Sequence, residues 1–270
     1  LLITSVPSMV VSIYGFPPLE LILFTVLGGT LLAVSANVLN QIFEISTDSL
    51  MERTVNRPLV TGEISKKNAY IYSISLGLFG YLILYTQSTT LAANIALSAN
   101  IFYSFIYTLI LKPRTNQNIV IGGAAGAAPV LIGWSATGAE LEIGSWLLFL
   151  LVFLWTPAHF WALSLENIDD YKDADFPMLP TQESKKRTAI FIGVYSCATV
   201  ITSILLAPIL QLGITYLVLA LLFGIYLMYK SYGLYIDKVK PISYFIFSNT
   251  YLAVIFLAMV GDIFITLGSI

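Results

Sequence analysis

This chain of 270 residues has few charged side chains. They make up 10% of it, against about 25% in an ordinary globular protein. Hydrophobic residues make up 57%. This composition excludes a soluble protein with a large core, and apolar runs of roughly 20 residues indicate an integral membrane protein. The net charge of −2 gives no indication of a nucleic-acid partner, so we expect none.

Cysteine is also nearly absent. Cys197 is the only one, which excludes an internal disulfide, and its place in an apolar run favours packing over chemistry. The first residues, LLITSVPSMVV, do not begin with a methionine and include no basic segment. We therefore expect not a signal peptide but a truncated amino terminus that begins within a first membrane span.

Apolar runs occupy most of what remains. Because backbone polar groups inside a bilayer must be paired within their own segment, each run is predicted to be a helix. We expect an all-α integral membrane protein, a bundle of about nine transmembrane helices that forms one domain over residues 1–270. The runs cover approximately residues 1–15, 19–43, 68–87, 89–111, 119–137, 143–165, 187–208, 213–230 and 242–268.

The basic residues all fall in alternate loops. All 13 lysines and arginines lie in or beside residues 44–67, 112–118, 166–186 and 231–241, and the opposite loops contain only acids. The positive-inside rule places these basic loops on the cytoplasmic side of a cell membrane. This pattern supports the expected number of spans, because one span more or fewer would put basic residues on both sides.

Asn40, Glu44 and Asp48 form the first of two acidic clusters. Being four residues apart, they share one face if the second helix continues past the membrane, with a drift of about 40° per step. The second cluster follows the sixth run, where Asp169 and Asp173 are again four residues apart. Like charges at this spacing mildly destabilise a helix, so a counter-charge is expected. Two further acids accompany this cluster: Asp170 and Asp175.

Mg²⁺ is one candidate for the counter-charge, because it prefers hard oxygen ligands and usually shares carboxylates with substrate phosphates. Basic residues suited to holding a diphosphate lie in the same loops, namely Arg53, Arg57, Lys112, Arg114 and Lys172. The pattern fits a metal-bound diphosphate, whose departure such a site would assist by neutralising its charge. Spacing alone leaves open a solvated rim of paired charges and the ion site of a transporter.

Four stretches carry a resemblance to a known family: LMERTVNRPL at 50–59, QNIVIGGAAGAAPVLIGWSATG at 117–138, WTPAHFWALS at 155–164 and DDYKDADFPMLP at 169–180. With the spaced acids, they resemble the UbiA-type intramembrane prenyltransferases, and among these most closely the branch that acts on haem B. The resemblance extends from the first span through the seventh and weakens toward the carboxyl end. It implies a helical bundle that uses Mg²⁺ to ionise an isoprenoid diphosphate.

The resemblance also implies a reaction and its partners. Farnesyl diphosphate donates its farnesyl group to a vinyl group of haem B, and water addition gives haem O. The implied partners are farnesyl diphosphate, haem B, membrane lipid, and proteins of haem A synthesis or oxidase assembly. The implied Mg²⁺ ligands are Asn40, Glu44, Asp48, Asp169 and Asp173, and the further catalytic candidates are Asp170 and His159.

Two positions depart from the family's first motif, which usually contains three aspartates. Glu44 stands where the first aspartate is usual, and Ser46 stands where the middle acid is usual. A glutamate still offers carboxylate oxygens, but one methylene further from the backbone, so the resemblance implies an altered metal geometry.

His159 is the only histidine, and it lies in an apolar layer ten residues before Asp169. An ionisable residue inside a membrane predicts a function by default, and a neutral imidazole can ligate haem iron or accept a proton. A packed, hydrogen-bonded histidine between Trp155 and Phe160 is the competing interpretation.

Three other functions stay open. One is a prenyltransferase of the same family with a quinone precursor or a lipid as acceptor, which the blocks at 117–138 and 155–164 disfavour. Another is a secondary transporter, which the position of both acid clusters at helix ends on one side disfavours. The third is a catalytically silent haem-handling protein, which the two changed acids favour.

Overall fold

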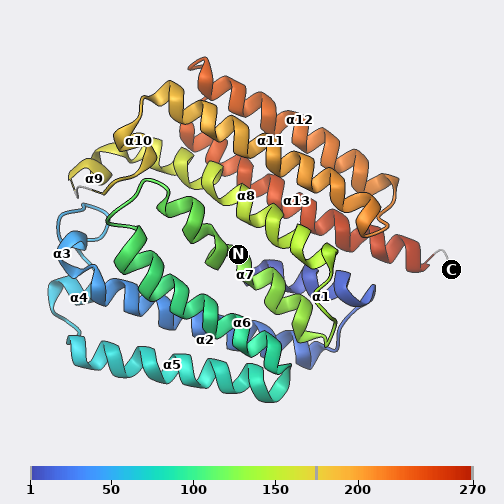
Figure 1. Cartoon of the computed structure of the whole chain (residues 1–270), viewed down its shortest axis with the longest axis horizontal. Coiled ribbons are helices and arrows are strands. Elements are labelled where there is room, and N and C mark those ends of the chain that lie inside the picture. Colours follow the sequence, from blue (N-terminus) through green and yellow to red (C-terminus); the bar gives the residue numbers. More distant parts are fainter. Residues whose placement is uncertain (1, 174–175, 269–270) are drawn as a thin grey trace.

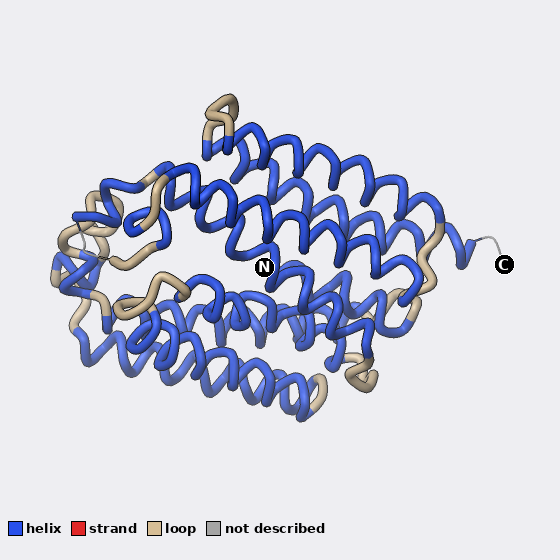
Figure 2. Tube along the Cα trace, turned by 45° about the horizontal axis from the view of Figure 1, so that its top comes forward, coloured by secondary structure: helices blue, strands red, loops and turns tan. Residues whose placement is uncertain are grey.

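The computed structural model describes residues 2–173 and 176–268, and in this part of the chain every regular element is a helix (Figure 1). Figure 2 shows the same bundle with its loops confined to the ends of the helices. Eight helices among the described residues are long and apolar enough to cross a membrane, which indicates a multi-pass membrane protein. They are α2 (Leu19–Phe43), α5 (Lys66–Gln87), α6 (Thr90–Ile101) continued by the π-helix η2 (Phe102–Leu111), α7 (Asn118–Ala136), α8 (Ile143–Glu166), α11 (Lys185–Ile209), α12 (Ile214–Tyr235) and α13 (Pro241–Gly268).

The first expected span differs from the other eight. It consists of the 3₁₀ turn η1 (Leu2–Thr4) and the helix α1 (Ser5–Ile13), which has 9 residues. At a rise of 1.5 Å per residue α1 is about 14 Å long, roughly half the hydrocarbon thickness of a bilayer. It packs closely on α7, because a Cβ at Gly133 would lie 2.1 Å from the carbonyl oxygen of Ser5. The expected nine spans are therefore eight spanning helices and one short helix.

Four short helices gather at one end of the bundle (Figure 1). They are α3 (Ile45–Asp48), α4 (Pro58–Thr61), α9 (Ile168–Asp173) and α10 (Leu179–Gln182). The long helices α5 and α11 start at this end, and the hydroxyls of Ser65 and Ser184 cap their first turns by accepting from backbone N–H groups. The fold thus brings both acidic clusters to the same end of the bundle.

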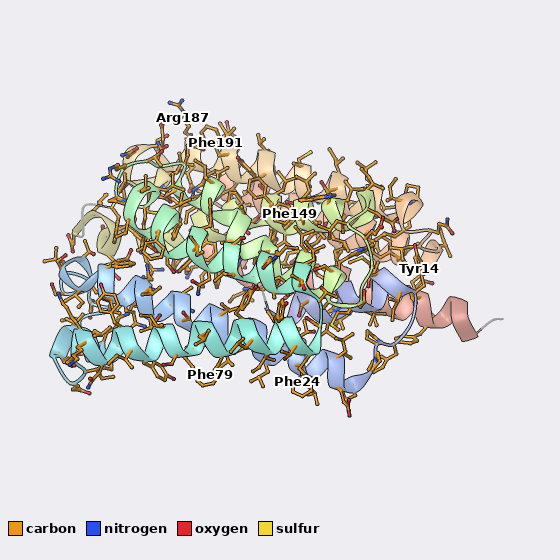
Figure 3. All side chains as sticks on the ribbon, turned by 60° about the horizontal axis from the view of Figure 1, so that its bottom comes forward. Tyr14, Phe24, Phe79, Phe149, Arg187 and Phe191 are labelled. Carbon is orange, nitrogen blue, oxygen red and sulfur yellow. The ribbon has the colours of Figure 1, made fainter. Side chains whose placement is uncertain are left out.

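Glycine lets α2 and α5 approach each other closely. A Cβ at Gly80 would lie 2.7 Å from the carbonyl oxygen of Gly28, so neither position has room for a side chain. Two turns nearer the acidic end, Ser73 donates a hydrogen bond to the carbonyl oxygen of Ser35 at 2.9 Å. The other face of α5 is apolar and points away from the bundle, as Phe79 shows with 59% exposure (Figure 3). An exposed apolar helix face is what contact with lipid requires.

The opposite half of the bundle is joined by buried hydroxyl groups. Ser196 and Ser203 on α11 lie 2.6 and 2.8 Å from the hydroxyls of Tyr244 and Tyr251 on α13. Both pairs are separated by seven residues on their helices, so the two contacts lie on one seam. Tyr216 of α12 donates to the carbonyl oxygen of Ser203 at 2.6 Å. These satisfied polar contacts hold α11, α12 and α13 in one register beside α8.

Candidate active site

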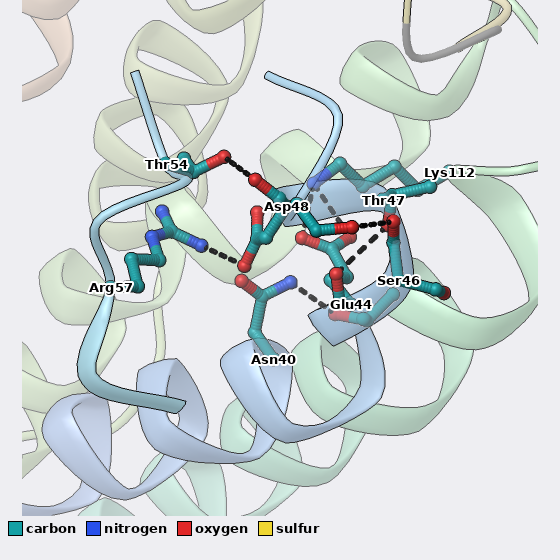
Figure 4. A network of polar contacts seen from close by, with 10 residues as sticks. Asn40, Glu44, Ser46, Thr47, Asp48, Thr54, Arg57 and Lys112 are labelled. Carbon is teal, nitrogen blue, oxygen red and sulfur yellow. Dashed lines mark hydrogen bonds and ion pairs between the residues drawn. The ribbon is translucent and has the colours of Figure 1, made fainter. Parts of the chain in front are cut away.

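The end of α2 brings Asn40, Glu44 and Asp48 together. The helix ends at Phe43, and the one-turn helix α3 follows at once. Hydrogen bonds from the Glu44 N–H to the Asn40 carbonyl (3.0 Å) and from the Asp48 N–H to the Glu44 carbonyl (2.7 Å) keep helical spacing across this junction. All three side chains are buried and face the same space (Figure 4). Ser46, which departs from the family's acidic motif, points away from them and is exposed (Figure 4).

Each of the two carboxylates has its own cationic partner. The Nη1 of Arg57 lies 2.5 Å from Oδ2 of Asp48, and the Nζ of Lys112 lies 2.6 and 2.7 Å from the two oxygens of Glu44 (Figure 4). Lys112 also lies over the ring of Phe176, 4.7 Å from its centroid. The site therefore holds two carboxylates and two cationic side chains, joined in two ion pairs.

Asn40 connects this cluster to the π-helix η2. Its Nδ2 donates to Oγ1 of Thr108 at 3.2 Å. In η2 the Lys112 N–H donates to the Tyr107 carbonyl, five residues back, at 2.8 Å. Such wide turns are frequent at functional sites, because they change the direction of the side chains that follow. Here the change directs Lys112 to Glu44 and turns Tyr103 and Tyr107 toward the interior.

An apolar cavity of ≈ 440 Å³ lies directly beneath the acidic cluster, between α2, α6, η2, α7 and α8. Asn37, one turn before Asn40, and the rings of Tyr103 and Tyr107 line it at the acidic end. The two ion pairs, Glu44–Lys112 and Asp48–Arg57, form a polar cap at this end. A polar cap beside an apolar cavity suits a ligand with a charged head and a hydrocarbon tail. The sequence argument missed both tyrosines, although their spacing of four residues just before Lys112 was a signal.

The second acidic cluster lies at the same end, but it is more open. Asp169 and Asp173 on α9 are exposed, as is Lys172, whereas Asp170 is half-buried. Asp175 lies outside the described residues. Among the residues that are described, no three or more histidine, cysteine, aspartate or glutamate side chains are grouped closely enough to share a metal ion. The five predicted metal ligands are therefore not assembled in one shell in this structure, and only the first three converge.

Three of the five predicted diphosphate-binding residues lie apart from the cap, among them the exposed Lys172 on α9. Arg53 is exposed, and Arg114 donates from Nη1 to the carbonyl oxygens of Leu109 (2.9 Å) and Ile110 (3.3 Å), where it caps the end of η2. Arg57 and Lys112 are in the cap. The five predicted residues thus divide into two that pair with Glu44 and Asp48 and three that do not.

His159 lies between two aromatic rings, which favours the packed interpretation of this residue. Its ring stacks on Trp155 at 4.1 Å and on Phe245 at 4.2 Å between centroids. Its Nδ1 lies 2.7 Å from Oγ of Ser248, whose single hydroxyl hydrogen is donated to the carbonyl of Phe245. The contacts assign the proton to Nδ1 and leave the lone pair on Nε2 in the neutral ring. That lone pair is the one feature of His159 suited to accepting a proton.

The donor set fits Mg²⁺ in its chemistry. Asn40, Glu44 and Asp48 present amide and carboxylate oxygens, which are the ligands that Mg²⁺ takes alongside substrate phosphates. Lys112 and Arg57 pair with these carboxylates, so a metal would have to displace or share them.

A helical membrane bundle with a polar cap over an apolar cavity defines an enzyme class that acts on amphipathic substrates in the bilayer. Comparison with known proteins identifies the family: the model of the UbiA prenyltransferase family matches residues 1–251, and the chain belongs to this family. The chain is similar to the protoheme IX farnesyltransferase of Leifsonia xyli, with 41% identity over 267 residues that cover 97% of this chain and 87% of that protein. It is 40% identical over 264 residues to the protoheme IX farnesyltransferase of Thermus thermophilus, and it spans 43% of the length of that relative.

Solved structures share the fold. A digeranylgeranylglyceryl phosphate synthase matches with a TM-score of 0.80 at 22% identity, covering 97% of this chain and 92% of that one. A UbiA homologue from Archaeoglobus fulgidus, solved bound to GPP and Mg²⁺, matches with a TM-score of 0.66 at 19% identity, covering 96% and 95%. The expected resemblance to this family and the expected helical fold are thereby confirmed.

Proposed function

We propose that this protein transfers the farnesyl group of farnesyl diphosphate to a vinyl group of haem B, with water addition, giving haem O. The observation that carries the proposal is the ion-paired cap of Glu44–Lys112 and Asp48–Arg57 at the mouth of an apolar cavity. The names of relatives about 40% identical support haem B as the acceptor.

The diphosphate and the hydrocarbon chain of the donor bind in two different parts of the site. Its diphosphate meets Arg57 and Lys112, whose charges suit phosphate oxygens. Its hydrocarbon chain enters the cavity, where the aromatic rings of Tyr103 and Tyr107 lie nearest the cap. Three further basic residues at the same end complete the proposed diphosphate-binding set: Arg53, Arg114 and Lys172.

The proposed ligands of Mg²⁺ are Asn40, Glu44, Asp48, Asp169 and Asp173. When bound, the metal supplies positive charge to the leaving diphosphate. The exposed Asp169 and Asp173 lie on the six-residue helix α9, beside the loop that carries Phe176. Phe176 contacts Lys112. A movement of Lys112 would therefore also affect Phe176 and, through it, bring α9 and the first acidic cluster together.

The reaction then has three bond changes. The bond between the allylic carbon and the diphosphate oxygen breaks, and the diphosphate leaves with the electron pair. The vinyl π electrons of haem B form a new carbon–carbon bond to the allylic carbon. Water adds to the resulting carbocation beside the porphyrin ring and loses a proton, for which Asp170 and Nε2 of His159 are the proposed acceptors. Tyr103 and Tyr107 would stabilise the allylic cation through their ring faces, and the apolar lining would keep water from it.

The proposed orientation follows from charge. All lysines and arginines lie at the end that carries the cap, so we place this end in the cytoplasm. The donor's head group then binds at the cytoplasmic interface while its chain stays at membrane depth. A protein of haem A synthesis or oxidase assembly is the class of partner that would take up haem O.

Purified protein in detergent, incubated with farnesyl diphosphate, Mg²⁺ and haem B, tests the proposal by mass spectrometry. Parallel reactions replace haem B with a quinone precursor, or replace Mg²⁺ with EDTA. We expect a Mg²⁺-dependent product with the mass of haem O. Transfer only to the quinone precursor would keep the prenyltransferase and exclude haem B as acceptor. No consumption of farnesyl diphosphate by folded protein under any condition would exclude the enzyme.

A further inference from the structure

Half of the 20 residues that line the cavity beneath the cap are glycine or alanine, which leaves space between the helices. Four glycines and six alanines are among the residues that line it, from α2, α6 and α7. On α7 the lining extends from Ile119 to Ile132, which corresponds to about 20 Å at a rise of 1.5 Å per residue. The cavity is therefore long and follows the helix axes away from the polar cap.

Its far end is lined by buried apolar residues. Leu32 of α2, Ala96 of α6 and Ile132 of α7 line this end, and all three belong to one buried cluster. The same cluster contains Met9 of α1, which is fully buried and lies behind the lining. A hydrocarbon chain that extends from the cap along α7 thus meets buried apolar residues, which form the floor of the cavity at this end.

We propose that Ile132 and Ala96 at this floor set the length of the prenyl chain that the protein accepts. The inference rests on the proposed function, because it takes the cavity as the site of the donor's chain. A longer chain would have to displace the branched side chain of Ile132. The small side chain of Ala96 leaves the last part of the space free, so a larger residue there would shorten the cavity. Ile132 and Ala96 act as specificity determinants and touch neither the diphosphate nor the acceptor.

Dissociation constants of the geranyl, farnesyl and geranylgeranyl thiolodiphosphates, measured in the presence of Mg²⁺, test this inference without any turnover. We expect Ile132→Ala to shift the ratio of the constants by about tenfold or more toward the geranylgeranyl analogue. We expect Ala96→Leu to shift it by a similar factor toward the geranyl analogue. Both factors follow from the selectivity of a hydrophobic pocket that gains or loses room for methylene groups.

Leu131→Ala is the matched control. Leu131 is buried on the same helix and its truncation removes a similar volume, but its side chain does not line the cavity. The control should bind the three analogues in the wild-type ratio. An equal shift in Leu131→Ala, or unchanged ratios in both floor variants, would overturn the inference. Should one floor variant fail to fold, the other decides the question, because the two predict shifts in opposite directions.

The binding measurement also separates this inference from the proposed function. Wild-type protein that binds the farnesyl analogue but forms no product with haem B would contradict the proposed reaction, and the floor variants would still test the length determinant. Normal haem O formation, with unaltered ratios of the dissociation constants in both variants, would support the proposed reaction. It would contradict the proposed role of Ile132 and Ala96.

Discussion

Lys112 holds both carboxylate oxygens of Glu44, at 2.6 and 2.7 Å from its Nζ, although the two residues are separated by 68 positions. The pair joins the end of α2 to the end of η2 directly above the cavity. It places a positive charge where the proposed reaction needs one, and it compensates a buried carboxylate when no metal is bound.

Removing Lys112 should make the protein depend on metal for stability. We expect Lys112→Met to lower the free energy of unfolding by about 2 kcal/mol in EDTA, since Glu44 then lies buried without a counter-charge. Mg²⁺ should restore most of the loss by taking the place of the ammonium. Thermal melting in EDTA and in Mg²⁺ measures both effects. Lys66→Met, at an exposed position on α5, should melt like wild type in both. An unchanged melting temperature for Lys112→Met in EDTA would show that Glu44 does not need this partner.

Asp48 should be required for turnover but not for insertion. We expect Asp48→Ala to abolish Mg²⁺-dependent transfer, because it removes two oxygens from the proposed metal site and releases Arg57 from its ion pair. Haem O formation, together with recovery of folded protein from membranes, measures the two properties. Asp237→Ala at the same end is the control, since this exposed carboxyl pairs with Lys185, whose hydrogen bond lowers the pKa of Asp237. Wild-type turnover in Asp48→Ala would remove the metal assignment.

Gly122 should be needed for the position of Tyr107. A Cβ at Gly122 would lie 2.4 Å from the tyrosine ring, so alanine there must displace the ring into the cavity or out of it. We expect Gly122→Ala to cost about 1–3 kcal/mol of stability, the usual range for overpacking, and to weaken binding of the farnesyl analogue. Gly261→Ala on α13 is the control, because nothing lies within 4 Å of its added methyl group. Equal stability and equal binding in the two variants would contradict this role of Gly122.

His159 can be tested with a variant that keeps its packing. Phenylalanine retains a ring between Trp155 and Phe245 but has no nitrogen to bond Ser248 or to accept a proton. We expect His159→Phe to fold and to bind the farnesyl analogue normally, with haem O formation lowered at least tenfold. General acid–base groups contribute roughly a hundredfold or more, so this is a conservative expectation. Full activity in His159→Phe would assign the residue to packing alone.

Helical periodicity was sufficient to predict the common face of Asn40, Glu44 and Asp48, and alternating basic loops were sufficient to predict that both acid clusters share one end. Periodicity did not identify Lys112 as the partner of Glu44, because contacts across 68 residues depend on how helices pack. The solvated-rim interpretation assumed charges in water, whereas Glu44 and Asp48 are buried.

Other features depend on geometry that spacing does not encode. A four-residue interval on the short helix α9 does not tell which side faces inward, and the structure exposes Asp169 and Asp173 while half-burying Asp170. The π-helix that turns Tyr103 and Tyr107 toward the cavity has no simple sequence period. Apolarity at residues 1–15 predicts the start of a first span, but it does not predict that the helix there has 9 residues.

A structure of the protein in lipid with farnesyl thiolodiphosphate and Mg²⁺ tests the central claim most directly. We expect the diphosphate at the cap, with Lys112 moved away from Glu44 toward a phosphate oxygen. We expect the metal near Asn40, Glu44 and Asp48. The farnesyl chain should extend along α7 toward Ile132. Density for the diphosphate elsewhere, with the cavity empty and both ion pairs intact, would contradict the account.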